Sequence, residues 1–280
     1  VSPDIIVLRT DGAVSEETRN KVALFCNVEP DCVIEDSNVD ILYEAPIMLE
    51  KSNFTAIVSR ELGLNDNPPD LKFWNEMLDK ARRRDKTVTI GLVGKYIKMF
   101  DTYLSIVEAL THAGIYNRAK IDLRWIDSEK ITADTAVEEL KDCDGIIVPG
   151  GFGDRGIEGM ILAAQYAREN GVPYLGICLG MQFLLEKSFE DGEYEGLGLI
   201  RGSVVRFQEG KIPQIGWNGV EGLKTPLFEG IREGTRFYFV HGYRADCGET
   251  FVCAETEYYV RYPSAVYCGN AFGVQFHPEK

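Results

Sequence analysis

Strands and helices alternate between Thr87 and Ile177, and this alternation constrains the fold more than any other feature of the chain. Apolar runs typical of buried strands (VTIGLVG, KIDLRWID, DGIIVPGG and VPYLGI) are separated by stretches with helical patterning at 103–114, 133–140 and 159–170. The first of these helices is predicted to end at Gly114. A chain with this order builds a doubly wound, mostly parallel α/β sheet, with functional residues at the carboxyl ends of the strands.

The segments on either side of this alternation have a different character. After Gly192 the strands are shorter and rich in aromatic residues, as in RFYFVHGYRA and SAVYCGNAFGVQF, which predicts an antiparallel extension of the sheet. Residues 1–64 begin with a strand-like run at 4–8 and a helix that opens at Ser15, and the prolines of NDNPPD then mark a change of composition. We therefore predict a small α/β segment with a linker at 1–85 and a larger domain at 86–280.

The charge and the cysteine content argue against several classes of protein. Asp and Glu outnumber Lys and Arg by 44 to 30, and the net charge of −14 disfavours binding to nucleic acid or to anionic membranes. No apolar run reaches the length of a membrane span, and the seven cysteines are scattered without C-x-x-C pairs. With three histidines, a histidine-based metal centre is not expected. The composition indicates a cytoplasmic protein with free thiols and no metal.

Cys178 stands between Gly176 and Gly180 in the stretch VPYLGICLGMQF, directly after a predicted strand. A Gly-x-Cys-x-Gly turn between a strand and a helix is typical of a nucleophile elbow, because the glycines allow a strained turn and close packing of the helix on the strand. A helix over 179–187 would place its N-terminus at the sulfur and favour the thiolate. The alternative interpretation is a buried structural cysteine.

The stretch NAFGVQFHPEK is predicted to form a strand that finishes in His277, Pro278 and Glu279. Alternation along an extended chain puts His277 and Glu279 on the same side. Glu279 can then orient an imidazole that serves Cys178, so the three residues are predicted to form a catalytic triad.

The stretch VPGGFGDRG follows another predicted strand at the same sheet edge and offers donors for an oxyanion. The candidates are the N–H groups of Gly151 and of Leu179, the residue after Cys178. Residues 151–156 also match the G-x-G-x-x-G pattern of dinucleotide sites, but the next strand lacks the acidic residue that this fingerprint requires. GLVGKY falls short of the phosphate-binding pattern G-x-x-x-x-G-K-[ST], so neither nucleotide motif is expected.

Together, PGGFGDRG, GICLGMQ and FHPE resemble the signature of the triad-type, or class I, glutamine amidotransferases, which release ammonia from glutamine through a cysteinyl thioester. Within that family, residues 1 to about 182 resemble the C-terminal part of CTP synthase, for example in PDIIVLRTD, KVALFCNV and VDILYEAPIMLE. Residues 183–280 instead resemble the glutaminase subunit of imidazole glycerol phosphate synthase, in IPQIGWNGVE and FYFVHGY. The chain is therefore interpreted as a hybrid whose two parts meet near GICLGMQ.

The resemblance implies roles for single residues. It agrees with the triad and the oxyanion donors, and it assigns further positions around the substrate glutamine: Gly151, Phe152, Gln182, Glu190, Gly242 and Tyr243. The histidine-biosynthesis subunit usually has serine where Gly242 stands. Trp217 and Asn218 resemble a loop that faces the synthase partner, while Lys21, Phe25 and Val39 match positions near the pyrimidine-nucleotide and ATP sites of CTP synthase.

The function that the resemblance implies is hydrolysis of L-glutamine to glutamate and ammonia, with the ammonia passed to a synthase site as acceptor. The glutaminase needs no cofactor, and ATP and Mg²⁺ belong to the amidoligase body, which this sequence does not contain, so amidation of UTP is not expected. Two alternatives stay open. One is a scaffold or subunit active only with a partner such as the cyclase of imidazole glycerol phosphate synthase, and the other is a different cysteine hydrolase acting on γ-glutamyl bonds. A homo-oligomer also stays open.

Overall fold

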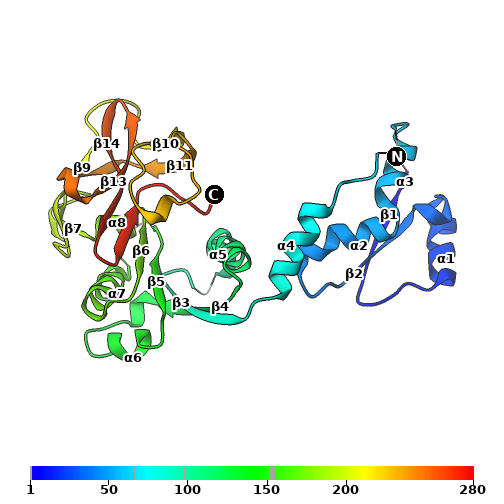
Figure 1. The fold of residues 1–280 in the computed structure, drawn as a ribbon, viewed down its shortest axis with the longest axis horizontal. Helices are drawn as coiled ribbons and strands as arrows, with labels where there is room; N and C mark the ends of the chain where they lie inside the picture. Colours follow the sequence, from blue (N-terminus) through cyan, green and yellow to red (C-terminus); the bar gives the residue numbers. More distant parts are fainter. Residues whose placement is uncertain (1, 66, 98, 152–154) are drawn as a thin grey trace. The chain divides into compact units, whose positions relative to one another are not determined.

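A computed structural model describes residues 2–65, 67–97, 99–151 and 155–280, and it divides into two compact units, residues 1–83 and 84–280 (Figure 1). The sheets and the buried apolar clusters of the two units are separate. Within the described residues, no helix combines the length and the apolar character needed to cross a membrane.

In its described residues, the first unit has two parallel strands and four α-helices. The strands are β1 (Ile6–Thr10) and β2 (Val33–Ser37), and the helices are α1 (Glu16–Cys26), α2 (Ala45–Lys51), α3 (Phe54–Glu61) and α4 (Lys72–Arg82). Helix α1 begins as predicted, because the Ser15 hydroxyl accepts a hydrogen bond from the Thr18 N–H at 3.2 Å. The core cluster of the described residues is small and consists of the buried side chains of Cys32, Ile34 and Ile57.

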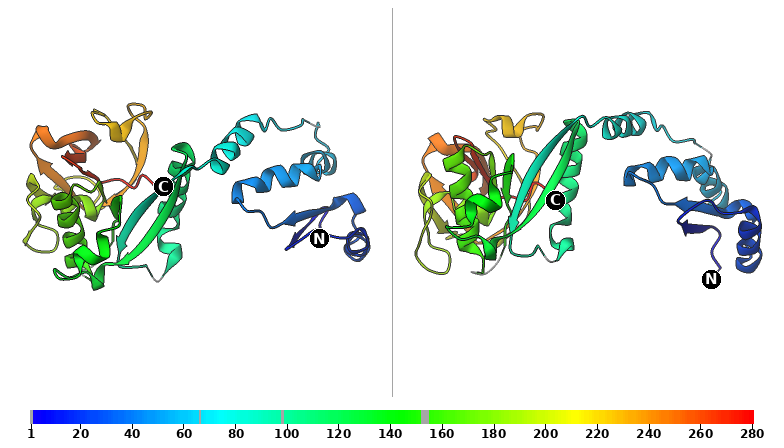
Figure 2. Two further views of the ribbon diagram at one scale, coloured as in Figure 1. Left: turned by 60° about the horizontal axis from the view of Figure 1, so that its bottom comes forward. Right: turned by 90° about the horizontal axis from the view of Figure 1, so that it is seen from below.

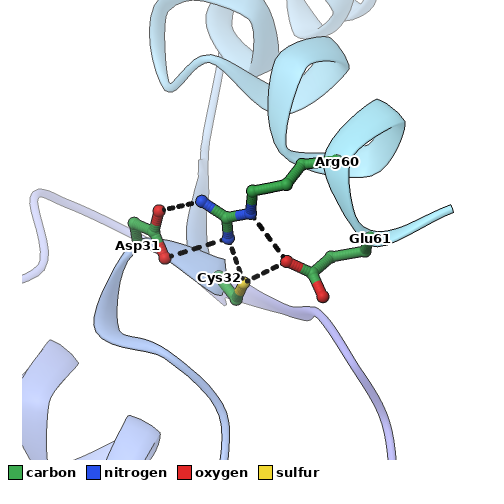
Figure 3. A network of polar contacts seen from close by, with 4 residues as sticks. All are labelled: Asp31, Cys32, Arg60 and Glu61. Carbon is green, nitrogen blue, oxygen red and sulfur yellow. Dashed lines mark hydrogen bonds and ion pairs between the residues drawn. The ribbon is translucent and has the colours of Figure 1, made fainter. Parts of the chain in front are cut away.

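Arg60 joins the end of α3 to the short helix η1 (Pro30–Cys32) that precedes β2, as Figure 3 shows. Its guanidinium pairs with Asp31 and Glu61, and its Nη2 lies 3.0 Å from Sγ of Cys32. The hydrogen bond from Arg60 lowers the pKa of Asp31, and burial raises the pKa of Cys32. These polar contacts link α3 to Cys32, a residue of the small core.

The second unit is built on a seven-stranded sheet in the order β13-β14-β15-β6-β5-β3-β4. The strands from β15 to β4 are parallel, and β13 and β14 add an antiparallel part. The bounds are β3 (Lys86–Gly94), β4 (Ala119–Asp127), β5 (Gly145–Val148), β6 (Tyr174–Ile177), β13 (Val252–Tyr258), β14 (Val260–Cys268) and β15 (Ala271–Val274). The predicted fold class is confirmed, and the direction of winding reverses at β3, between β4 and β5.

Helices cover both faces of this sheet (Figure 2). Helix α5 (Leu104–Tyr116), preceded by η3 (Phe100–Tyr103), packs on one face, while α6 (Ala136–Leu140) and α7 (Ile157–Asn170) pack on the other, next to η4 (Ser128–Lys130). Neighbouring residues of β3 show the division: Leu92 belongs to the core cluster of Ile106 on α5, and Val93 to that of Met160 on α7. Successive side chains of the strand thus point to opposite faces and pack into two separate cores.

Two smaller sheets flank the central one. The first has the order β12-β9-β7-β8 and the second is the hairpin β10-β11. Their strands are β7 (Leu185–Ser188), β8 (Tyr194–Glu195), β9 (Ile200–Arg206), β10 (Gln214–Gly219), β11 (Arg236–His241) and β12 (Tyr243–Cys247). The short helices η2 (Leu42–Glu44), η5 (Pro226–Phe228) and η6 (Glu249–Phe251) complete the two units.

Two predicted element boundaries were wrong. In both cases, pairing with a strand elsewhere in the sequence decides where the element ends. The helix predicted over 179–187 is limited to α8 (Leu179–Gln182), since Leu185 starts β7 and pairs with Ile200 of β9. The stretch RFYFVHGYRA forms two strands of different sheets, which separate at Gly242. Local patterns give no sign of either partner strand.

The predicted end of the first helix of the second unit was also wrong. Helix α5 runs on to Tyr116, and Gly114 lies inside it. A Cβ atom at Gly114 would come 2.7 Å from the backbone oxygen of Ala119. The glycine therefore permits a close approach of β4 to the helix instead of ending it.

Candidate active site

Cys178 lies between β6 and α8, and its backbone has the strain of a nucleophile elbow. Its φ of 54° and ψ of −106° are rare for a residue with a side chain. A Cβ at Gly176 would lie 2.2 Å from the oxygen of Gly180, and a Cβ at Gly180 would lie 2.3 Å from the oxygen of Val148. Only glycine on both sides allows this turn, which holds the sulfur at the carboxyl end of the parallel strands.

The short length of α8 weakens one expectation about the sulfur. Few peptide dipoles add up over the four residues of α8. The stabilisation of a thiolate that we expected from a helix over 179–187 is correspondingly reduced.

His277 and Glu279 lie on the same side of the chain, with 2.9 Å between Nδ1 and Oε1. The segment that holds them connects two sheets, because the Gln275 N–H donates to Ser264 of β14 and the His277 N–H donates to Tyr238 of β11. Regular strand β15 ends earlier than the sequence predicts, at Val274. The two backbone anchors fix the imidazole without a continuous strand.

The environment of His277 favours its charged form. Burial lowers the pKa of His277, but the neighbouring Cys178 and Glu279 outweigh this effect and raise the pKa to about 9. Nδ1 is taken by Glu279, and Nε2 is buried without a hydrogen bond of normal geometry to any described residue. A proton on Nε2 is therefore available to a group that reacts at Cys178.

Cys178, His277 and Glu279 meet at a cavity of about 280 Å³. The loop after β5 forms one wall, since a Cβ at Gly150 would lie 3.1 Å from Cβ of Cys178 and 3.6 Å from Cε1 of His277. Other lining residues come from the start of α5 and the stretch before it: Tyr96, Thr102, Tyr103, Ser105 and Ile106.

The two predicted oxyanion donors belong to the cavity wall and to the start of α8. Gly151 lines the cavity, and Leu179 is the first residue of α8, where an N–H has no partner within the helix. Phe152, which was predicted to contact glutamine, lies outside the described residues.

Other predicted glutamine contacts do not line this cavity as the structure describes it. Gln182 is 5% exposed and donates from Nε2 to Oε1 of Gln275 at 3.4 Å. Its own Oε1 is buried and has no hydrogen-bond partner among the described residues. Gln182 is therefore connected to the nucleophile through another side chain.

Tyr243 begins β12 of the four-stranded small sheet, Gly242 directly precedes it, and Glu190 lies between β7 and β8. The residue after Glu190, Asp191, donates its N–H to Oη of Tyr243 at 3.5 Å, and burial raises the pKa of Glu190. A Cβ at Gly242 would meet only Cγ2 of Ile212, at 3.6 Å. The serine that the resemblance leads us to expect at this position fits without a clash.

Sequence reasoning missed two buried polar residues beside the site. Nε2 of Gln275 lies 3.5 Å from Sγ of Cys178, and the Lys95 side chain packs against Gly151 directly after β3. Gln275 stands two residues before His277, so the alternation that placed Glu279 also places Gln275 on the histidine's side. Lys95 follows a parallel strand, where the rule for sheet edges expects functional residues.

His241 is a third buried polar group, and it supports the turn at Gly242. Its Nδ1 lies 2.6 Å from the oxygen of Tyr243, and its Nε2 lies 3.3 Å from Oη of Tyr262, which donates to Gln214 at 2.8 Å. Burial lowers the pKa of His241 to about 4, so the ring is neutral at pH 7 and donates its Nδ1–H to Tyr243.

We expect His241 to make the second unit sensitive to acid. An unfolded His241 takes up a proton near its usual pKa of 6.5, and the folded residue does so only near 4, so stability falls as the pH drops through this window. At about 1.36 kcal/mol per pH unit, the loss approaches roughly 3 kcal/mol. Asn keeps an N–H donor and does not titrate. Between pH 7 and pH 4, the free energy of unfolding of wild type should therefore fall by about 3 kcal/mol more than that of His241→Asn. Urea unfolding of both proteins at several pH values measures this difference. Parallel curves would contradict the assignment.

The remaining predicted positions lie on β10 and in the first unit. Trp217 of β10 is 55% exposed and contacts the ring of Tyr238, and Asn218 accepts a hydrogen bond from Gln214. In the first unit, Lys21 pairs with Glu17 on the exposed side of α1, Phe25 is 86% exposed one turn later, and Val39 follows β2, half-buried. In the part of the chain that the structure describes, no group of three His, Cys, Asp or Glu residues is placed to hold a metal ion.

Comparison with known proteins gives the class of this chain. Residues 98–280 match the family described as glutamine amidotransferase class-I, so the chain belongs to this family. Residues 1–64 match the family described as CTP synthase N-terminus.

Similar proteins are CTP synthases. One from Clostridium kluyveri is 48% identical over 197 residues, which cover 70% of this chain and 37% of that protein. One from Thermus thermophilus is 51% identical over 182 residues, covering 65% and 33%. The chain thus spans about a third of the length of these curated relatives.

A solved structure is similar as well. The glutaminase domain of Trypanosoma brucei CTPS, with bound acivicin, is 26% identical with a TM-score of 0.54, covering 69% of this chain and 86% of that one. The chain carries a glutamine amidotransferase domain similar to that of CTP synthases.

Proposed function

We propose that the second unit hydrolyses L-glutamine to glutamate and ammonia, with Cys178 as the nucleophile and His277 and Glu279 as its partners. The observation that carries this proposal is the meeting of a strained cysteine elbow and a His–Glu pair at one cavity. The raised pKa of His277 supports it, because a protonated imidazole can deliver a proton to a leaving amine.

The reaction follows from the positions of these groups. The Cys178 thiol gives its proton to Nε2 of His277, the thiolate attacks the side-chain carbonyl of glutamine, and the N–H groups of Gly151 and Leu179 stabilise the oxyanion. His277 gives its Nε2 proton to the nitrogen, the C–N bond breaks and ammonia leaves. Water then attacks the thioester and gives a proton to His277, the C–S bond breaks, and glutamate leaves. No cofactor takes part in these steps.

The proposal is tested by the purified chain with two measurements. We expect release of glutamate from glutamine, and covalent labelling by a glutamine analogue that carries an electrophile in place of the side-chain amide. Mass spectrometry should locate the label at Cys178. Cys247 and Cys253, whose pKa burial raises to about 11, are expected to stay unlabelled. Label on other cysteines without label on Cys178 would contradict the proposal.

Glu279→Gln is expected to lower kcat by about 10²-fold. The variant keeps the shape of the side chain but removes the charge that helps to raise the pKa of His277. Glu257→Gln, on the exposed side of β13, is the matched control and should keep wild-type activity. Equal kcat values for Glu279→Gln and wild type would show that Glu279 does not assist the histidine.

A second candidate is a glutaminase that reaches full activity only with a synthase partner. It is favoured by the positions of Gln182, Glu190 and Tyr243, which do not line the cavity of the triad. Addition of a cyclase-type synthase subunit should then raise glutamate release at least about tenfold, whereas an autonomous enzyme would not respond. A γ-glutamyl peptidase would instead prefer γ-glutamyl peptides to free glutamine.

The first unit fits the tail of an amidoligase domain of the CTP synthase type, with a linker that ends near residue 85, followed by the glutaminase at 86–280. Its two-stranded parallel sheet and small core support this assignment, because parallel sheets are normally larger and covered on both faces. Leu24 and Phe25 are 79% and 86% exposed, as expected for surfaces that the rest of such a domain covers. ATP, Mg²⁺ and the ammonia acceptor site would belong to that remainder.

A further inference from the structure

Gln275 is a buried amide in direct contact with the sulfur of Cys178. Its side chain is fully enclosed, and Nε2 donates to Sγ at 3.5 Å. The register of the sheet explains the contact, because Val274 of β15 lies opposite Ile177 of β6, and Gln275 and Cys178 are the next residues along each chain. The Cys178 N–H also donates to the oxygen of Val274 at 2.7 Å.

The orientation of this amide is set by its other contacts. Gln182 donates from Nε2 to Oε1 of Gln275 at 3.4 Å, so the amide oxygen is occupied and the NH₂ group faces the sulfur. The backbone N–H of Gln275 donates to Ser264 at 2.9 Å and fixes the base of the side chain. A chain of contacts therefore runs from Gln182 through Gln275 to the nucleophile.

We propose that Gln275 is a further catalytic residue, whose amide N–H stabilises the thiolate of Cys178, and that Gln182 positions it. A hydrogen bond to a charged acceptor is stronger than one to a neutral acceptor, so the amide favours the thiolate over the thiol. The same donor favours departure of the thiolate when the thioester is hydrolysed, because the sulfur regains its charge in that step. This inference rests on the proposed role of Cys178 and adds a group that the triad does not include.

The test measures alkylation of Cys178 by iodoacetamide, which reacts with thiolates and needs no glutamine site. The rate at Cys178 is followed by mass spectrometry of the full chain across a range of pH. Gln275→Glu keeps the size of the side chain and loses the donor, and Gln275→Met removes both polar groups. At pH 7 we expect alkylation about tenfold or more slower in both variants, with the pH profile moved to higher pH.

Two further variants separate positioning from general damage. Gln182→Met should slow alkylation less than the Gln275 variants do and move the pH profile in the same direction. Gln214→Met is the matched control, because Gln214 is equally buried but contacts Tyr262 and Asn218 instead of the sulfur. Its alkylation rate should equal that of wild type.

Wild-type alkylation rates and pH profiles in folded Gln275 variants would overturn the inference. If the Gln275 variants do not fold, Gln182→Met decides, and an unchanged profile in that variant overturns the inference as well. Failure of the proposed function has a different signature: wild type would release no glutamate while its alkylation still depended on Gln275. The two hypotheses are therefore tested separately.

Discussion

Cys178→Ala is expected to lower glutamate release by at least about 10⁴-fold, because the sulfur is the atom that bonds to the substrate carbon and no neighbouring group can replace it. Alanine leaves the elbow in place, since the backbone contacts of Cys178 with Val274, Met181 and Gln182 do not involve its side chain. The variant should therefore remain folded with its cavity intact. Glutamate release by the purified chain, measured beside thermal unfolding, checks both parts of this expectation.

Cys268→Ala is the matched control for this variant. Cys268 is also a free, half-buried cysteine of the same unit, at the end of β14. It should keep glutamate release within about twofold of wild type, because its truncation removes only one small buried group. Activity of Cys178→Ala comparable to that of the control would place the nucleophile elsewhere and exclude the triad.

The elbow and the parallel sheet could be predicted because their determinants lie close together in the sequence. Gly176, Cys178 and Gly180 lie within five consecutive positions, and the steric demands that the structure shows act between these positions and the strands beside them. The His277–Glu279 pair followed from alternation over three residues. Each of these patterns has a local physical cause, so the sequence could indicate it.

The rest depended on contacts between distant segments. The chain after Gln182 forms β7 because Leu185 pairs with Ile200, and nothing in residues 183–188 distinguishes a buried helix from a strand at this point. Gln182 was assigned to the substrate by resemblance, and the structure shows it packed on Gln275, 93 residues away. A side chain's partner across such a distance is fixed by sheet register, which the sequence alone does not give.

Gly180→Ala is expected to destabilise the second unit by about 3 kcal/mol, although alanine is the better helix former by about 1 kcal/mol. The added Cβ would lie 2.3 Å from the oxygen of Val148, a backbone atom of β5 that cannot move without disturbing the sheet. In a unit of this size such a loss corresponds to a fall in Tm of roughly 6–12 °C. Thermal unfolding followed by circular dichroism measures it.

Gly248→Ala is the control, because Gly248 has φ of −66° and a Cβ there would meet only Oγ1 of Thr250, at 3.8 Å. Its Tm should stay close to that of wild type. Comparison of Gly180→Ala with Cys178→Ala then separates close packing from catalysis at the elbow. Cys178→Ala should lose activity at unchanged stability, whereas Gly180→Ala should lose stability first. A Gly180→Ala protein as stable as the control would mean that α8 can move away from β5, and that the close packing of the elbow is not what holds the nucleophile in its strained conformation.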